Sequence, residues 1–277
     1  MKFVVLLLCF VTIPVTAAQR LVSIGGDVTE IIYALGSGDQ LVGRDTTSQR
    51  PEASLKLPDI GYMRQLNSEG ILALKPTLVL TNAQAQPSQV FQQIEKVGVK
   101  VVTVPATPQL SEIAVKVNTL AQALGKTAQA QPILQRLDQQ LSALKQVPAS
   151  GSHKALYIMA NHGMQSLIAG KETAADIALR SAGLTNVMGQ VPHYQQMSQE
   201  GVIAAAPEVI IIDQHALQQM GGASQLWKLP GLALTPAGKA HRVVVIDQMA
   251  LLGFGIDTPQ AILKLRQDVA ESYARQP

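Results

Sequence analysis

The chain has 277 residues, of which 47% are hydrophobic and 15% are charged, and this composition excludes an intrinsically disordered protein. The length is sufficient for one large domain or two ordinary globular domains with packed cores. The formal net charge is +3 without any cluster of lysine or arginine, so we expect no DNA or RNA partner.

The first 17 residues have the pattern of a secretory signal peptide. Lys2 precedes an apolar run from Phe3 to Phe10, and small residues follow up to Ala17, where we expect cleavage. The run is too short to span a membrane as a helix. Cys9, the only cysteine, lies in this run but lacks the small residues that normally precede a lipid-modified cysteine. We therefore expect an exported protein whose cleaved chain has no cysteine, with a lipoprotein as the alternative.

Residues 18–125 alternate between short apolar strands and helices. Leu21–Ile24 has the pattern of a buried strand that ends at two glycines, and apolar residues then recur at helical spacing up to Leu35. Strands that alternate with helices predict a parallel sheet covered on both faces, here in an N-terminal lobe. Further strands are expected at 41–43, 78–80 and 99–104, and further helices at 71–74 and 90–97.

One long helix is expected at residues 126–147. Ala, Gln, Leu and Arg dominate this segment, its leucines and Ile133 form one helical stripe, and Pro132 stands near the start. A helix of about 15 to 20 residues spans about 25 to 30 Å, close to the width of a small domain. Such a connecting helix would act as a strut and allow only small movements, so we expect the cleft beside it to be largely preformed.

An internal repeat predicts that residues 148–277 form a second lobe of similar topology. When the sequence is shifted by 131 positions, residues 65–80 fall on residues 196–211, and Gln, Glu, Gly, Ala and Pro coincide. A chance likeness between two helix-to-strand passages is the alternative. The expected fold is α/β, with two Rossmann-like lobes that contain parallel sheets, a long helix that joins them and a ligand cleft between them. The flanking segments repeat as well, with 21–36 and 99–104 matched by 155–183, which is longer, and 242–247.

Four stretches of the N-terminal lobe carry family motifs. They are LVSIGGDVTEIIYALG at 21–36, VGRDTT at 42–47, LPDIGYMRQL at 57–66 and EGIL at 69–72. Together they resemble the periplasmic haem-binding proteins of bacterial haem ABC importers, within a wider helix-strut family that also captures siderophores and cobalamin. The opening stretch is typical of the wider family, whereas Gly-Tyr-Met-Arg at 61–64 points to haem.

The resemblance covers essentially the whole chain after residue 17 and implies a function. It implies a soluble periplasmic carrier that takes haem b from an outer-membrane haem receptor system. The carrier would then deliver haem to an inner-membrane ABC permease with its ATPase. We expect it to act as a monomer.

Tyr62 matches the position from which the N-terminal lobe of the family supplies a tyrosinate ligand to ferric haem. A phenolate is a hard anionic oxygen that favours Fe(III), and tyrosine is an established axial ligand of haem. The residue lies between Pro58 and a helix expected to begin near Asn67, in a loop that could face the cleft. Without the resemblance, a packed aromatic ring with a satisfied hydroxyl is the ordinary interpretation.

Two histidines of the second lobe are candidates for an opposing iron ligand, which some members of the family have. His162 follows an apolar run at the carboxyl end of an expected strand, where open α/β sheets present ligand groups. His193 falls on Tyr62 when the two copies of the repeat are superposed. We prefer His162 to His193, and loop histidines without a ligand role are the alternative. Members of the family hold one haem or two stacked haems, so the stoichiometry stays open.

Four more residues are candidates for the haem pocket. Arg64 could pair with a haem propionate through a bidentate fork, or it could be an ordinary surface arginine. Arg44 matches the family motif, although an internal salt bridge explains it equally well. Met63 and Met164 could line an apolar porphyrin slot, although methionine is also common core filler.

Glu69 and Glu200 occupy equivalent positions in the two copies of the repeat, each just inside an expected helix start. An acidic residue in the first turn is favoured by the helix dipole, which is the simplest explanation. The resemblance implies a second role, in which one acidic residue per lobe docks on the permease. A pseudo-symmetric pair of charges would suit a dimeric transporter.

The sequence contains no pattern that indicates catalysis. A Gly-x-Ser-x-Gly elbow, a His-Glu-x-x-His helix and a phosphate-binding Walker loop are all absent, so we expect no enzyme. A secreted hydrolase is a remote alternative, because a dispersed triad leaves no local pattern. The principal alternative is a ferric-siderophore or cobalamin-binding protein of the same fold, which needs no phenolate ligand to iron.

Overall fold

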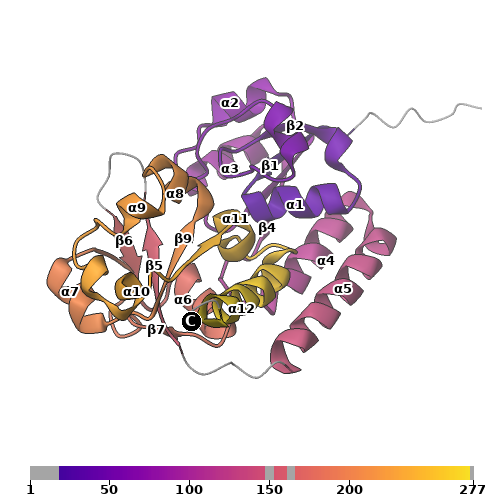
Figure 1. The fold of residues 1–277 in the computed structure, drawn as a ribbon. Coiled ribbons are helices and arrows are strands. Elements are labelled where there is room, and N and C mark those ends of the chain that lie inside the picture. The colour runs from indigo at the N-terminus through magenta and orange to yellow at the C-terminus, as the bar shows by residue number, and fades with distance from the viewer. Residues whose placement is uncertain (1–18, 147–152, 161–165, 275–277) are drawn as a thin grey trace, which may run out of the picture.

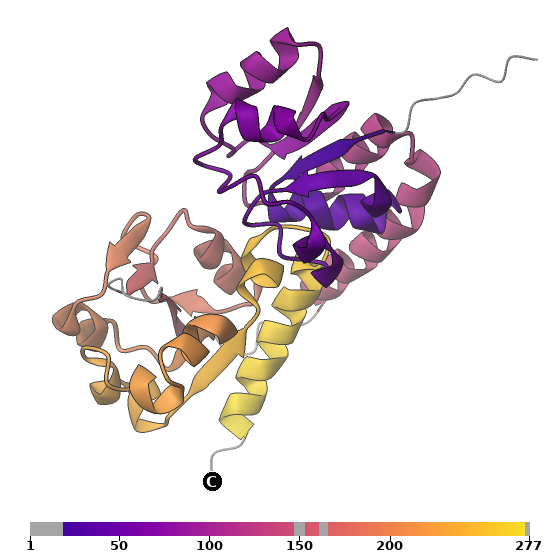
Figure 2. The same cartoon turned by 90° about the horizontal axis from the view of Figure 1, so that it is seen from above.

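The computed structural model describes residues 19–146, 153–160 and 166–274 as two α/β lobes (Figures 1 and 2). The expected signal peptide and its cleavage site lie outside the described residues. Within the described residues, no helix has the length and apolarity needed to cross a membrane.

The N-terminal lobe contains a four-stranded sheet in the order β2-β1-β3-β4, and all of its strands are parallel, as predicted. The strands are β1 (Leu21–Ile24), β2 (Leu41–Arg44), β3 (Leu78–Asn82) and β4 (Lys100–Val104). The helices of the lobe are α1 (Gly26–Ala34), α2 (Ser68–Ala73), α3 (Ser88–Lys96) and α4 (Glu112–Leu124), with short 3-10 turns at Gly38–Gln40 and Glu52–Lys56.

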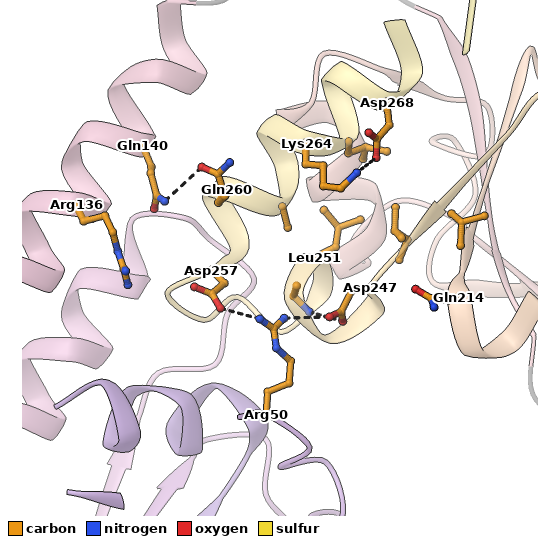
Figure 3. Close-up of a pocket in the computed structure, with 15 residues that line it drawn as sticks. Arg50, Arg136, Gln140, Gln214, Asp247, Leu251, Asp257, Gln260, Lys264 and Asp268 are labelled. Carbon is orange, nitrogen blue, oxygen red and sulfur yellow. Dashed lines mark hydrogen bonds and ion pairs between the residues drawn. The ribbon is translucent and has the colours of Figure 1, made fainter. Parts of the chain in front are cut away.

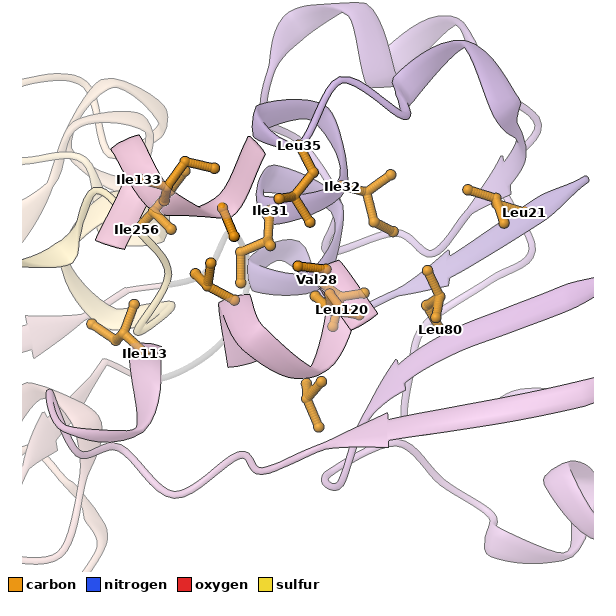
Figure 4. Close-up of a cluster of buried hydrophobic side chains, with 14 of the residues drawn as sticks. Leu21, Val28, Ile31, Ile32, Leu35, Leu80, Ile113, Leu120, Ile133 and Ile256 are labelled. Carbon is orange, nitrogen blue, oxygen red and sulfur yellow. The ribbon is translucent and has the colours of Figure 1, made fainter. Parts of the chain in front are cut away.

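Alternate side chains of this sheet enter two cores. Leu21 and Leu80 pack with α1, α4 and the following long helix, as Figure 4 shows, whereas Val22 and Val79 pack on the other face with α2 and α3. Because successive strand residues point to opposite faces, a strand that is apolar throughout requires cover on both sides. This explains why the strands could be predicted from short, mainly apolar runs.

The long helix α5 (Thr127–Gln146) lies within the range expected from the sequence. It packs against α4 and against the last helix, α12 (Thr258–Ala274). Ile133 and Leu137 belong to a core of the N-terminal lobe, whereas Leu144 belongs to a core of the C-terminal lobe. The helix therefore contributes apolar side chains to both lobes.

The C-terminal lobe contains a six-stranded mixed sheet, which corrects the prediction of a wholly parallel one. Its parallel part consists of β10, β9 and β5 with β7 beside β5, whereas β6 pairs antiparallel with both β5 and β8. The strands are β5 (Lys154–Met159), β6 (Leu167–Ala169), β7 (Thr185–Asn186), β8 (Tyr194–Gln196), β9 (Val209–Asp213) and β10 (Val243–Ile246). The helices that precede α12 are α6 (Ala174–Ser181), α7 (Gln199–Ala205), α8 (Gln214–Gln219), α9 (Ala223–Leu226), α10 (Pro236–Lys239) and α11 (Gln248–Leu252), with a 3-10 turn at Leu232–Leu234.

The repeat is present in the structure. α2 and β3 correspond to α7 and β9 at the predicted shift of 131 positions, and the order β1-β3-β4 matches β5-β9-β10. β6 belongs to the part of the second copy that is longer than the first. This additional strand, together with β8, accounts for the antiparallel part of the second sheet.

Candidate functional site

A cavity of about 700 Å³ lies between the lobes. Its N-terminal wall includes Tyr62, Met63 and Arg64, and its C-terminal wall includes His193 and Tyr194. The volume is within the range of about 300 to 1,000 Å³ that is usual for sites of small molecules and cofactors. The repeat thus places its equivalent positions, Tyr62 and His193, in the lining of one cleft.

Tyr62 is presented to the cavity by a tight loop. Gly61 has a φ of 98°, a left-handed conformation that favours glycine, and its N–H donates to Asp59 Oδ1 at 2.8 Å. The carbonyl of Tyr62 accepts from the N–H of Gln65 at 2.8 Å, which closes a turn. Met63 is only 7% exposed and anchors the loop in the lobe's core, whereas Tyr62 is 42% exposed. The loop thereby buries one side chain and exposes the phenol beside it.

Arg64 lies at the same wall and is exposed. Its Nη2 donates to Gln84 Oε1 at 3.2 Å, and Gln84 Nε2 in turn donates to the carbonyl of Ala106 at 2.9 Å. The guanidinium is therefore held near the cavity by a neutral partner. Its charge is available to an anionic group of a ligand.

Arg44 is not brought to this cavity. Its side chain is buried, and Nη1 donates to Asp59 Oδ2 at 2.9 Å and to the carbonyl of Asp45 at 3.1 Å. The internal salt bridge that the sequence left open is therefore present. Asp59 also accepts from the N–H of Gly61, so Arg44 helps to hold the Tyr62 loop in place through Asp59.

Two paired loops form the opposite wall. The N–H of His193 donates to the carbonyl of Lys171 at 2.9 Å, and the N–H of Gly170 donates to the carbonyl of His193 at 2.9 Å. His193 and Glu172, both in the cavity lining, have φ values of 59° and 66°, a conformation that is unusual for residues other than glycine. Burial raises the pKa of the neighbouring Tyr194 to about 12, so its phenolate forms less readily than that of an ordinary tyrosine.

His162 and Met164, the other candidates of this lobe, lie outside the described residues. Met249 and Met159 line the cavity together with Met63. Apolar, polarisable side chains therefore reach the cavity from both lobes.

The cavity lining also includes a buried polar cluster of Asp27, Asn82 and Lys116, which was not predicted from the sequence. Lys116 Nζ lies 2.6 Å from Asp27 Oδ2, both side chains are at most 3% exposed, and Asn82 Nδ2 donates to Asp27 Oδ1 at 3.1 Å. Lys116 Nζ also donates to the carbonyl of Phe254, in the other lobe, at 3.0 Å. The available indication was the position of Lys116, which shares one helix face with the apolar residues Ile113 and Leu120.

Glu69 and Glu200 are exposed in the first turns of α2 and α7. The preceding N-caps are equivalent, because Asn67 accepts from the N–H of Gly70 and Ser198 from the N–H of Gly201. α2 and α7 lie at outer parts of different lobes, away from the cavity lining (Figure 1).

A family model described as periplasmic binding protein matches residues 21–250. The chain belongs to this family. The family resemblance that was expected from the sequence is thus confirmed.

Several similar solved structures are periplasmic haem-binding proteins. RhuT from Roseiflexus sp. RS-1, in its apo form, is 34% identical with a TM-score of 0.86, and the match covers 92% of this chain and 99% of RhuT. BhuT in complex with two hemes is 36% identical with a TM-score of 0.85, over 92% of this chain and 98% of BhuT. HutB of Vibrio cholerae is 30% identical with a TM-score of 0.81, over 91% and 98% of the two chains.

The sequence is also similar to curated relatives with a different named ligand. The vitamin B12-binding protein of Yersinia pseudotuberculosis is 30% identical over 234 residues, which cover 83% of this chain and 81% of the relative. The fold and the family are therefore shared by proteins named for haem and proteins named for cobalamin.

Proposed function

We propose that this protein binds haem in the interlobe cavity and delivers it to an inner-membrane ABC permease for haem and iron uptake. The observation that carries the proposal is the placement of Tyr62, a substantially exposed phenol in the lining of a cavity of about 700 Å³. Similarity to the haem-binding proteins RhuT, BhuT and HutB supports the same ligand.

The residues around Tyr62 suit an anionic porphyrin. The phenolate would coordinate ferric iron as an axial ligand, and the guanidinium of Arg64, two residues later, would pair with a propionate. Met63 and Met249 offer apolar contacts to the porphyrin face. Arg44 acts indirectly in this scheme, because its pairing with Asp59 supports the loop.

The opposite lobe would supply any second ligand. His193 is the candidate among the described residues, since it lines the cavity in the position equivalent to Tyr62. His162 remains the other candidate from the sequence. A cavity lined by Tyr62 on one wall and His193 on the other would suit either one haem or two stacked haems.

The transport role follows from the family. We propose that the protein works as a monomer in the periplasm, after cleavage near Ala17, and receives haem b from an outer-membrane receptor system. Glu69 and Glu200 would dock on the permease, whose ATPase drives release. As a binding protein it would carry out no catalysis.

Titration of the ligand-free protein with hemin tests the proposal. We expect saturable binding with the optical spectrum of a ferric haem that has a tyrosinate ligand. Tyr62→Phe should lose or shift that spectrum, whereas Tyr33→Phe, on α1 outside the cavity lining, should retain it. Identical spectra for wild type and Tyr62→Phe would refute the assignment of the ligand.

Cobalamin is the second candidate, because the curated relatives with 30% identity are vitamin B12-binding proteins. A corrin needs no phenolate from the protein. Cyanocobalamin should therefore bind wild type and Tyr62→Phe with equal affinity if it is the ligand. Calorimetric titration of both proteins with hemin and with cyanocobalamin separates the two candidates.

A further inference from the structure

One segment of the C-terminal lobe, residues 247–257, passes along the floor of the interlobe cavity and is held by the N-terminal lobe. It contains α11, from which Gln248, Met249 and Leu252 line the cavity. Ala250 and Leu251 line a second cavity of about 660 Å³ on another face of α11. The position of this short helix therefore helps to set the shape of the binding cavity.

Arg50, in the N-terminal lobe, holds both ends of this segment. Its Nη1 lies 3.2 Å from Asp247 Oδ2 and its Nη2 lies 2.8 Å from Asp257 Oδ2. Figure 3 shows the guanidinium between the two carboxylates. Asp247 is also the N-cap of α11, where its Oδ1 accepts from the N–H of Ala250 at 3.1 Å. The guanidinium of Arg50 thus connects the N-terminal lobe to the N-cap of α11, Asp247, and to the residue just before α12, Asp257.

The middle of the segment is held by a second, buried cation. Lys116 Nζ donates to the carbonyl of Phe254 at 3.0 Å and is paired with Asp27. Gly255 passes so close to α1 that a Cβ atom there would lie 2.5 Å from Glu30 Oε2. The chain could not shift toward α1 at this point without displacing that side chain.

The segment is also connected to its own lobe. The N–H of Gln248 donates to Asp213 Oδ2 at 3.1 Å, and the hydroxyl of Tyr157 donates to Gln248 Oε1 at 3.1 Å. α11 is therefore tied to the second sheet on one side and to the first lobe through Arg50 and Lys116. A change in the angle between the lobes therefore has to lengthen or break at least one of these hydrogen bonds or ion pairs.

The two cations differ in solvent access. Lys116 is almost fully buried, whereas the side chains of Arg50, Asp247 and Asp257 are 32%, 56% and 44% exposed. Exposed ion pairs are weakened by salt, and those in a dry interior much less so. Breaking the ion pairs of Arg50 with Asp247 and Asp257 should therefore cost less free energy than breaking the buried contacts of Lys116. The lobes could then move apart at Arg50 while the Lys116 contacts stay formed.

We propose that Arg50 is a positioning residue for ligand retention. It does not line the binding cavity, and it holds α11 in place so that the cavity stays closed on its ligand. The inference rests on the proposed function, in that the ligand occupies this cavity. It extends that function by naming the interlobe contact that opens when the ligand leaves.

The dissociation rate of hemin, followed by transfer to excess apomyoglobin, tests the proposal. Arg50→Gln should release hemin about 3- to 10-fold faster, as expected from the loss of its two exposed ion pairs to the C-terminal lobe. The third ion pair of Arg50, to Glu30 Oε1 at 3.8 Å, lies within the N-terminal lobe. Between 20 mM and 500 mM NaCl, the release rate of Arg50→Gln should also depend less on salt than that of wild type, with a remaining dependence from the pairing of Arg64 with a propionate. The spectrum of bound hemin should not change, because Tyr62 is untouched.

Four further variants make the result specific. Arg136→Gln, on the wall of the second cavity, is the matched control and should release hemin at the wild-type rate. Arg50→Lys should recover part of the retention. Arg50→Glu should release hemin fastest, and adding Asp247→Lys and Asp257→Lys should slow it again.

A measurement without ligand separates this proposal from the proposed function. Spin labels on Gln92→Cys in α3 and Gln218→Cys in α8, both exposed, report the distance between the lobes in the chain that begins after Ala17, which has no other cysteine. Arg50→Gln should broaden this distance distribution. If hemin fails to bind wild type, the proposed function fails while this test still stands. Unchanged distances together with an unchanged salt dependence would overturn the role of Arg50.

Discussion

Glu30, on α1 next to Arg50, is a carboxyl group whose protonation is strongly altered by the fold. Burial raises its pKa from 4.5 to about 8, opposed by the charge of Arg50 and assisted by Asp257, Asp27 and Asp247. The folded protein therefore holds a proton that the unfolded chain releases near pH 4.5. That proton's stabilising contribution is complete below the lower pKa and is lost as the pH rises through about 8.

Replacing Glu30 by glutamine should make stability less dependent on pH. Glutamine is neutral at every pH, so Glu30→Gln should differ from wild type by only about 1 kcal/mol at pH 5 and be more stable by about 4 to 5 kcal/mol at pH 9, at about 1.4 kcal/mol per pKa unit. Urea unfolding at both pH values measures the difference. Glu95→Gln, an exposed change on α3, is the control and should shift neither value. A gain for Glu30→Gln that is equal at pH 5 and pH 9 would contradict the raised pKa.

At the residue scale, the sequence predicted the placement of Tyr62 at the cavity better than it predicted buried partners. That placement was predictable because a motif of consecutive residues carries Tyr62. The partner of Arg44 was not, since Asp59 is brought beside it by a bridge between β2 and the following loop. The pairing of Lys116 with Asp27 joins residues 89 positions apart, and no local pattern encodes such a contact.

At the scale of elements, α2 should depend strongly on its N-cap. The helix has six residues, too few to be stable alone, and Asn67 Oδ1 accepts from the N–H of Gly70 at 2.7 Å. Asn67→Ala should lower the free energy of unfolding by about 1 kcal/mol, whereas Asn67→Gly should cost only a few tenths, ~0.3 kcal/mol. Chemical denaturation of both variants measures the losses. No measurable loss for Asn67→Ala would contradict a stabilising role of this cap.

Elements were predictable where burial imposes a regular pattern. β1, β3 and β9 are buried on both faces and therefore appear as predominantly apolar runs. β8 consists of Tyr-Gln-Gln and β6 of three residues, so neither shows such a run. The antiparallel part of the second sheet was missed because its short strands are specified by tertiary pairing and not by local hydrophobicity.

At the scale of the whole molecule, the repeat predicted two lobes but could not predict what joins them. A shift of 131 positions relates equivalent elements and places Tyr62 and His193 at equivalent points. The contacts across the lobes are not repeated, since Arg50 and Asp247 lie 197 positions apart and have no counterpart pair. Duplicated topology therefore explains why each lobe contributes one wall of the cavity, whereas the contacts that join the lobes are not related by the repeat.

The paired helices α2 and α7 lead to a prediction about docking. Glu69 and Glu200 are exposed and capped in the same way on different lobes, and they are not in the cavity lining. If each contacts a basic site on the permease, Glu69→Gln with Glu200→Gln should slow delivery of haem into vesicles that contain the transporter by at least about 10-fold, or about 1.4 kcal/mol. Hemin affinity should stay unchanged, because neither residue reaches the ligand.

A matched pair of substitutions shows whether position or charge is responsible. Glu95→Gln with Glu172→Gln also removes one negative charge from each lobe but leaves both capped helices intact. Because Glu172 lines the cavity, hemin affinity is measured for this control first and delivery is compared at saturating hemin. If the control slows delivery as much as the Glu69 and Glu200 pair does, long-range charge and not docking would explain the effect. If only the Glu69 and Glu200 pair slows delivery, the two helix starts would be the surfaces that the permease recognises, one from each lobe.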